Sequence, residues 1–200
     1  IMSALTNAMR VLTDPGHCGA VAIALCQDVQ GESFDYPVEF FRKRVHFIPR
    51  QIPCDYEVRQ VAEKIKESKK PLVIVGGGVR YSLAGETVKA FCEKHNIPFS
   101  ETQAGKSAIE SSHYLNVGGI GVTGNSSANV LAKDADLIIG IGSKFTDFTT
   151  SSKWLYADKQ VVTINASAFH AGKLDSIKMV ADALEGVKDI EKYLDGYKTA

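Results

Sequence analysis

The feature that most constrains the fold is an apolar run that ends in three glycines, at residues 71–78. Residues 72–75 are four consecutive apolar residues, three of them β-branched, which is typical of a strand buried on both faces. Glycines after such a strand give the backbone positive-φ freedom and let another group approach closely. Ser82 is predicted to be the N-cap of the next helix. This order predicts the opening β-turn-α unit of a doubly wound domain, where phosphate often binds.

The rest of the chain from residue 55 alternates predicted helices and strands. Helical spacing predicts helices that begin at Asp55, at Ser82, before Ala128 and before Leu184. Apolar runs predict further strands at residues 97–101, 137–142, 161–165 and 176–180. Residues 102–124, rich in Gly, Ser and Thr, are expected to form loops with a turn or two of helix. The predicted fold class is therefore α/β, a doubly wound, Rossmann-like parallel sheet of about six strands with helices on both faces.

The first 30 residues follow a different pattern. A helical stripe of apolar residues is ended by Asp14-Pro15-Gly16, and residues 20–25 are predicted to form a buried strand. Since one helix and one strand cannot build a core, residues 1–30 are expected to be the remnant of a preceding domain. The alternative is that they add to the edge of the main sheet. Residues 31–54 are predicted to be a linker, with a short helical turn at 38–42 as an alternative, and residues 55–195 the main domain.

The overall charge and composition exclude several classes of protein. The net charge is zero, which argues against a nucleic-acid binder. The apolar runs are far shorter than the roughly 20 residues that span a bilayer, so no membrane is expected to be a partner. The four cysteines are widely spaced without a C-x-x-C pair, and the histidines show no metal-ligand spacing. Reduced thiols and a cytoplasmic location are therefore expected.

The predicted ligand site lies beyond the carboxyl ends of the strands, where open parallel sheets bind ligands. Backbone N–H groups of the glycine turn could hold a phosphate, and either of two lysines could pair with its charge. The candidate nucleotide-binding residues are Gly77, Gly78, Thr102, Lys106, Gly142 and Lys144. However, Tyr81 breaks the G-x-G-x-x-G fingerprint, and Glu101 is a lone acid where a ribose-binding acid would lie. The alternative is that these glycines only make tight turns and close helix–sheet contacts.

The sequence contains no complete catalytic constellation. Ser107 has no partnered histidine nearby in sequence, and His113 is interpreted as a turn or packing residue. Asp134 and Asp136 flank a strand start and are expected to be solvated. No H-E-x-x-H, Walker A or G-x-S-x-G motif occurs. No catalytic residue and no metal ligand is therefore predicted in this chain.

Several of these segments together resemble the central domain of thiamine-diphosphate enzymes of the acetolactate synthase and pyruvate oxidase group. The resemblance rests on residues 71–78, Thr102-x-x-Gly105-Lys106, His113, residues 118–124 and residues 135–142. Residues 25–29 resemble the L-P-x-D-V end of the pyrimidine-binding domain of that group. Longer strings resemble one branch, whose members hydrolytically open a cyclic 1,2-diketone in myo-inositol degradation. These strings are residues 27–32, 35–37, 43–46, 76–82, 101–106 and 146–150.

The resemblance implies a homo-oligomeric parent enzyme that binds thiamine diphosphate and Mg²⁺. Its activating glutamate is expected upstream of Ile1 and its G-D-G…N motif downstream of Ala200, so no catalytic residue is carried over. The chain alone is expected to be an inactive architectural domain, with the flanking domains as its partners.

Relatives of this group bind FAD, ADP or nothing in the central domain. FAD-binding members carry Arg-Phe-Asp-Asp-Arg where residues 144–148 here lack both arginines, and lysine suits phosphate less well than arginine. FAD or ADP is therefore not expected, and no cofactor is expected on this chain. The alternatives are an acetolactate-synthase-like domain that binds FAD or ADP, and a stand-alone nucleotide-binding module of the NAD type.

Overall fold

The computed structural model describes residues 1–199, and these divide into two units that are treated separately. Unit 1 comprises Ile1–Pro49 and unit 2 begins at Arg50. Unit 1 contains the helix α1 (Met2–Leu12) and two short 3-10 turns, η1 (Val29–Gly31) and η2 (Val38–Phe41). The turn η2 confirms the predicted alternative at residues 38–42.

The strand predicted at residues 20–25 is absent, which corrects that prediction. All six of these residues are exposed and carry no ladder hydrogen bonds. A strand needs a neighbour to pair with its backbone groups, and among residues 1–49 there is none. The strands of the main sheet all come from residues 71–180, so the segment does not extend that sheet either.

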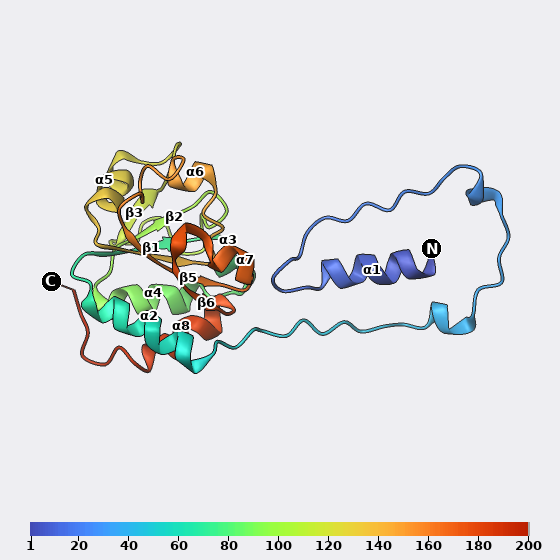
Figure 1. The fold of residues 1–200 in the computed structure, drawn as a ribbon, viewed down its shortest axis with the longest axis horizontal. Coiled ribbons are helices and arrows are strands. Elements are labelled where there is room, and N and C mark those ends of the chain that lie inside the picture. The colour runs from blue at the N-terminus through green and yellow to red at the C-terminus, as the bar shows by residue number, and fades with distance from the viewer. Residues whose placement is uncertain (200) are drawn as a thin grey trace. The chain divides into compact units, whose positions relative to one another are not determined.

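Unit 2 is built on a parallel sheet of six strands (Figure 1). The strands are β1 (Pro71–Val75), β2 (Phe99–Glu101), β3 (Asn116–Gly119), β4 (Leu137–Ile141), β5 (Gln160–Asn165) and β6 (Ile177–Val180). Their order is β3-β2-β1-β4-β5-β6, and Val73 lies opposite both Phe99 and Ile139. The chain reverses its winding direction between β1 and β4, which makes the carboxyl ends of these two strands the topological switch point. The predicted α/β class is confirmed.

Helices cover both faces of this sheet (Figure 1). On one face lie α2 (Asp55–Glu67), α4 (Gly85–His95) and α8 (Ala183–Glu191), and on the other lies α5 (Ser126–Asp134). Because side chains alternate along a strand, Val73 and Val75 join the first apolar cluster, and Leu72 and Ile74 join the second. The short elements α3 (Gly77–Tyr81), α6 (Asp147–Thr150), α7 (Ala168–Ala171) and η3 (Lys173–Asp175) follow the strand ends.

Two predictions near the central strand need correction. Ser82 does not cap the next helix, since it ends α3, and α4 begins at Gly85 after its N-cap Ala84. Leu83 adopts a φ of +56°, which turns the chain between the two helices. Residues 102–124 contain the edge strand β3 and no helix. The sequence of β3, Asn-Val-Gly-Gly, shows little apolar periodicity. Each residue of this strand is only partly buried.

Candidate functional site

The six predicted site residues all lie beyond the carboxyl ends of β1, β2 and β4. Gly77 and Gly78 begin α3, and Gly142 directly follows β4. The loop that follows β2 is joined to β1, because the Thr102 N–H donates to the Val75 carbonyl at 3.0 Å. The three segments therefore meet as predicted.

The switch point between β1 and β4 is closed by direct backbone contact. The Gly76 N–H donates to the Ile141 carbonyl at 2.8 Å, and the Gly78 N–H donates to the Gly142 carbonyl at 3.0 Å. A methyl group placed on Gly76 would lie 2.3 Å from the Gly142 carbonyl oxygen. Gly142 itself adopts a φ of +62°, which favours glycine. The N–H groups of Gly76 and Gly78 are thus directed at another strand end and not at a ligand.

The loop after β2 is folded tightly against β1. Gly105 donates its N–H to both the carbonyl and the hydroxyl oxygen of Thr102, each at 3.0 Å. A methyl group on Gly105 would lie 2.1 Å from the Val75 carbonyl oxygen, so this glycine is required for the close approach. Thr102 and Gly105 therefore form a turn that fills the space next to the glycine run.

Glu101, placed by its position in sequence where a ribose-binding acid would lie, holds the same loop in place. Its side chain is almost fully buried, with only 5% of the residue exposed. One carboxylate oxygen accepts the Ser107 N–H at 3.1 Å and the other accepts the Asn116 side-chain amide at 3.4 Å. Both carboxylate oxygens are therefore engaged within the protein.

The two candidate lysines lie at the rim of this region. Lys106 and Lys144 are both exposed, and among residues 1–199 neither side chain forms an ion pair. The Lys144 carbonyl accepts a hydrogen bond from the Lys173 ammonium at 2.9 Å. The positive charge is present at the rim, whereas the N–H groups of Gly76 and Gly78 donate to the carbonyls of Ile141 and Gly142.

Five exposed apolar residues lie in the segments that follow the carboxyl ends of the strands. Tyr81 at the end of α3 is 90% exposed, and Leu83, Phe148 in α6 and Phe169 in α7 are also highly exposed. Val122 joins them, because its N–H donates to the Phe148 carbonyl at 2.8 Å. We call these five residues the apolar rim. Its members come from the segments that follow four strands, β1, β3, β4 and β5, and each of them is more than half exposed.

The other residues singled out in the sequence have structural contacts. His113 packs on Phe99, with 5.5 Å between the ring centroids, and its Nε2 lies 2.9 Å from a Glu93 carboxylate oxygen. Asp134 forms an ion pair with Lys70 at 3.0 Å.

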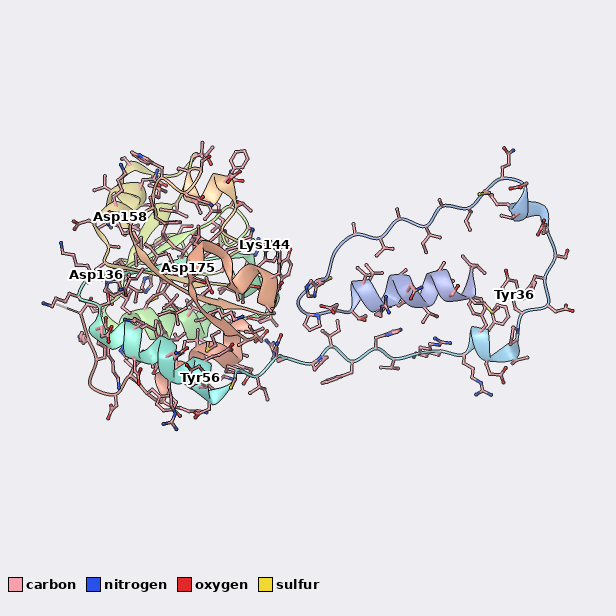
Figure 2. The ribbon with its side chains drawn as sticks, in the orientation of Figure 1. Tyr36, Tyr56, Asp136, Lys144, Asp158 and Asp175 are labelled. Carbon is pink, nitrogen blue, oxygen red and sulfur yellow. The ribbon has the colours of Figure 1, made fainter. Side chains whose placement is uncertain are left out.

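Asp136 was expected to be solvated, and its exposure agrees with this prediction. Although the residue is exposed, its carboxylate accepts hydrogen bonds from the Ser68 hydroxyl and from the N–H groups of Lys69 and Lys70. It precedes β4, at the opposite end of the strand from Lys144 (Figure 2).

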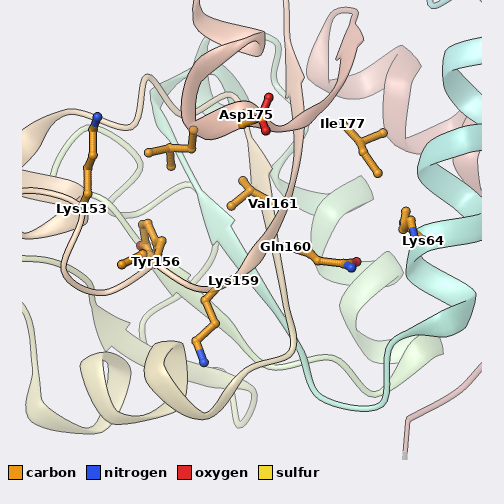
Figure 3. Close-up of a pocket in the computed structure, with 10 residues that line it drawn as sticks. Lys64, Lys153, Tyr156, Lys159, Gln160, Val161, Asp175 and Ile177 are labelled. Carbon is orange, nitrogen blue, oxygen red and sulfur yellow. The ribbon is translucent and has the colours of Figure 1, made fainter.

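A pocket of about 660 Å³ lies near the amino ends of β5 and β6, at the opposite ends of the strands from the candidate site (Figure 3). Lys64, Lys153, Lys159 and Asp175 supply its charges. Lys153 and Lys159 point in opposite directions (Figure 3), so their ammonium groups do not converge on one point. Tyr156 forms part of the wall, and burial raises the pKa of its phenol. The pocket was not predicted from the sequence; Lys64 of α2 lines it together with residues from the range 153–177.

The described residues offer no site for a metal ion. Among residues 1–199, no group of three or more His, Cys, Asp or Glu side chains is arranged to hold one. Within the same residues, no helix has the length and apolar character needed to cross a membrane.

Comparison with known proteins relates this sequence to enzymes. It is 58% identical over all 200 residues to a 3D-(3,5/4)-trihydroxycyclohexane-1,2-dione hydrolase of Geobacillus thermodenitrificans, of which it covers 31%. It is 60% identical over 203 residues to the Clostridium tetani protein of the same name, covering all of this chain and 32% of the relative. The chain thus spans about a third of the length of the curated relatives it matches.

A solved structure shares the fold. A protein from Mycobacterium smegmatis, described as thiamin diphosphate-dependent, matches with a TM-score of 0.64 and 19% identity, over 77% of this chain and 30% of that one. The family model for the central domain of thiamine pyrophosphate enzymes matches residues 58–190, which include all six strands of the sheet. The chain therefore belongs to the thiamine pyrophosphate enzyme central-domain family.

Proposed function

We propose that this chain is the architectural central part of a thiamine-diphosphate- and Mg²⁺-dependent hydrolase. The proposed parent enzyme adds water across a C–C bond of trihydroxycyclohexane-1,2-dione and opens its ring to 5-deoxy-glucuronate in myo-inositol degradation. The relatives that carry this hydrolase name match the whole chain at 58–60% identity, which supports the substrate. The cytoplasmic location and the homo-oligomeric parent belong to the same proposal.

The observation that carries the architectural role is the closed switch point. In related folds a nucleotide diphosphate lies between the glycine turn and the neighbouring strand end. Here the Gly142 carbonyl occupies that position, 3.0 Å from the Gly78 nitrogen. Gly77, Gly78, Thr102 and Gly142 therefore serve packing in this proposal, and neither FAD nor ADP is held there.

The proposal places no thiamine diphosphate and no Mg²⁺ on the residues of this chain. Magnesium needs oxygen ligands in octahedral geometry, and no metal-ligating cluster exists among residues 1–199. We therefore assign both groups to the parts of the parent enzyme that lie outside this sequence, and derive no chemical step from the residues here.

The apolar rim supports a second aspect of the role, in which the domain helps to wall an active site built by other domains. Exposed aromatic side chains gathered at one edge of a sheet are typical of surfaces that another domain covers. In the same proposal, residues 1–30 belong to the pyrimidine-binding domain, residues 31–54 are the linker, and residues 55–195 form the central domain.

The absence of a nucleotide site is tested by isothermal titration of the chain with FAD, ADP and NAD. We expect no heat of binding at micromolar concentrations, because the N–H groups of Gly76 and Gly78 are already used. Binding of any of the three would favour the nucleotide-module alternative. The double variant K106A/K144A would then show whether the binding occurs at the predicted site, since these are its two free cations.

The assignment of the chemistry to other domains is tested by turnover. With thiamine diphosphate, Mg²⁺ and the cyclic dione, the 200-residue chain is expected to give no ring opening. A longer polypeptide with flanking domains, as in the relatives, is expected to be active. Turnover by the short chain would contradict the architectural role, whereas an inactive longer chain would contradict the substrate.

A further inference from the structure

The chain enters unit 2 at Arg50, and this residue contacts the ends of two helices. Its guanidinium donates from Nη1 to the Ser82 carbonyl at 2.7 Å and to the Asp182 carboxylate at 2.9 Å. Ser82 is the C-cap of α3, and Asp182 is the N-cap of α8. One side chain therefore joins three segments that are far apart in sequence.

Both acceptors are held in place by the helices that end or begin there. A carbonyl at the end of a helix has no N–H partner within that helix, and an arginine is a suitable donor to it. The Asp182 carboxylate accepts the N–H groups of Leu184 and Glu185 at 3.0 and 3.4 Å, which fixes its orientation. Its side chain is only 17% exposed, so solvent screens its charge less than that of a surface carboxylate.

The residues that follow Arg50 have contacts of their own with unit 2. The Asp182 N–H donates to the Gln51 carbonyl at 2.9 Å, so Asp182 binds two successive residues of the entering chain. Pro53 is buried, and the Cys54 carbonyl accepts the Val58 N–H of α2 at 3.1 Å. The entering chain is thus attached to the domain from Arg50 onward.

The residues that precede Arg50 differ from it in their contacts. Residues 42–49 are all exposed. In the part of the chain that the structure describes, Arg44 forms no hydrogen bond and no ion pair. Two arginines six positions apart therefore have opposite surroundings.

We infer that Arg50 is a clasp that fastens the entering chain to the end of α3 and the start of α8, so that the fixed part of the polypeptide begins there. We call Arg50, the Ser82 carbonyl and the Asp182 carboxylate the entry clasp. Its contacts lie within unit 2 and do not depend on the proposed function. Opening of the clasp should free Arg50, whereas Gln51 and Pro53 keep their own contacts.

The entry clasp is the outermost attachment of the chain to the domain, so it sets where the free tether ends. In the proposed parent enzyme, a preceding domain is then tethered from Arg50 and not from Asp55, where α2 begins. Five extended residues span at most about 17 Å. Attachment of residues 50–54 to the domain therefore shortens the reach of the tether by about that length, and only this step rests on the proposed function.

Trypsin tests the clasp directly, because it must bind the side chain of the arginine after which it cleaves. Cleavage of the Arg50–Gln51 bond requires the clasp to open, so its rate reports the open fraction. Arg44 is the exposed reference. In the native 200-residue chain, with initial rates from mass spectrometry, cleavage after Arg50 should be at least about tenfold slower than cleavage after Arg44. Equal rates would overturn the inference.

The variant D182N removes the charge that pairs with Arg50 and keeps the neighbouring contacts. Asparagine is as good an N-cap as aspartate, and the backbone bond to the Gln51 carbonyl is unaltered. Because the bond to the Ser82 carbonyl also remains, the clasp should open in part. We expect cleavage after Arg50 to become about threefold faster or more, with cleavage after Arg44 unchanged. An unchanged rate after Arg50 would contradict the inference.

The matched control is D189N. Asp189 lies on the same helix and pairs with Lys192, so this variant removes an equal charge from α8 without touching the clasp. Cleavage after Arg50 should stay as slow as in the unmodified chain. Equal acceleration in D182N and D189N would show a general loosening of α8 and would count against the clasp.

The guanidinium ¹H–¹⁵N signals of the unmodified chain keep the test decisive if D182N does not fold. Two hydrogen bonds at Nη1 hinder rotation of the Arg50 guanidinium. Arg50 should therefore show separate Nη signals, and Arg44 a single averaged one. An averaged signal for Arg50 would overturn the inference.

Discussion

Units 1 and 2 both carry regularly spaced apolar residues, yet only one of them has a core. In unit 2, strand residues on both faces of the sheet pack against helices and form two apolar clusters. In unit 1, Ala8 is the only buried residue among residues 1–49, although α1 carries a stripe of Leu and Met. The difference shows that periodicity determines an amphipathic element, whereas burial requires a second layer to cover it.

The largest expected difference between the units is in hydrogen exchange. Amides of β1 should open only on global unfolding, which costs on the order of 5–15 kcal/mol for a domain of this kind. Amides of α1 should exchange almost freely, because an isolated helix of this length is marginal in water. Exchange measured on the monomeric chain checks this comparison. Equal protection of residues 1–12 and of β1 would show that the helix is covered by structure within the chain.

The second-largest expected difference between the units is the loss of stability caused by a Gly→Ala substitution. Gly142→Ala places a side chain at a φ of +62° and 2.6 Å from the Gly78 Cα. The left-handed conformation costs roughly 1–2 kcal/mol and the overpacking a further 1–3 kcal/mol or so. Urea unfolding followed by the fluorescence of Trp154, the single tryptophan, measures the loss.

The matched control for that substitution is Gly31→Ala in unit 1. A methyl group on Gly31 has no neighbour within 4 Å, so the change in stability should stay within about 0.5 kcal/mol. A large loss of stability in Gly31→Ala, or no loss in Gly142→Ala, would contradict the conclusion that unit 2 is packed and unit 1 is not.

The smallest expected effect concerns two aspartates that accept backbone hydrogen bonds, one in each unit. Burial raises the pKa of Asp136, but the hydrogen bonds from Ser68, Lys69 and Lys70 outweigh it and lower the pKa below its ordinary value of 3.8. Because the pKa is lowered on folding, this carboxylate stabilises unit 2 above about pH 4, and the contribution is lost as the pH falls through the folded pKa.

The substitution Asp136→Asn should therefore reduce the stability of unit 2 by about 1 kcal/mol at neutral pH and remove part of its acid sensitivity. Urea unfolding at several pH values checks this. In unit 1, hydrogen bonds from the N–H groups of His17 and Gly16 lower the pKa of Asp14. Asp14→Asn should leave the unfolding of unit 2 unchanged, and a loss as large as that of D136N would show that the units are coupled.

Much of the fold could be predicted from sequence because the buried strands are continuous apolar runs. The run at residues 71–75 and the run at 137–141 became β1 and β4 with almost the predicted bounds. The edge strand β3 was missed, since Asn116–Gly119 lies at the edge of the sheet, where little apolar surface is needed. The strand predicted at residues 20–25 failed for the opposite reason, because its apolar residues have no partner to pair with.

The sequence pattern predicted where the candidate residues lie, but it did not predict whether the space between β1 and β4 is open. Strand order alone brings Gly77, Thr102 and Gly142 to one edge of the sheet, and the sequence pattern was sufficient to place them there. Whether the space between them is open depends on backbone contacts, such as the hydrogen bond of 3.0 Å from the Gly78 N–H to the Gly142 carbonyl. No pattern of residue types encodes such a contact directly.

Local sequence patterns were sufficient to predict the parallel α/β class, the central strand with its glycine turn, and the resemblance to the thiamine-diphosphate family. These depend on local periodicity and on short strings of residues, which act within a few neighbours along the chain. Tertiary contacts determine that the glycine turn is closed by the end of β4 and that the buried His95 ring contacts Glu191 and Tyr197. These contacts join residues far apart in sequence, and their chemistry depends on distances that only the folded chain fixes.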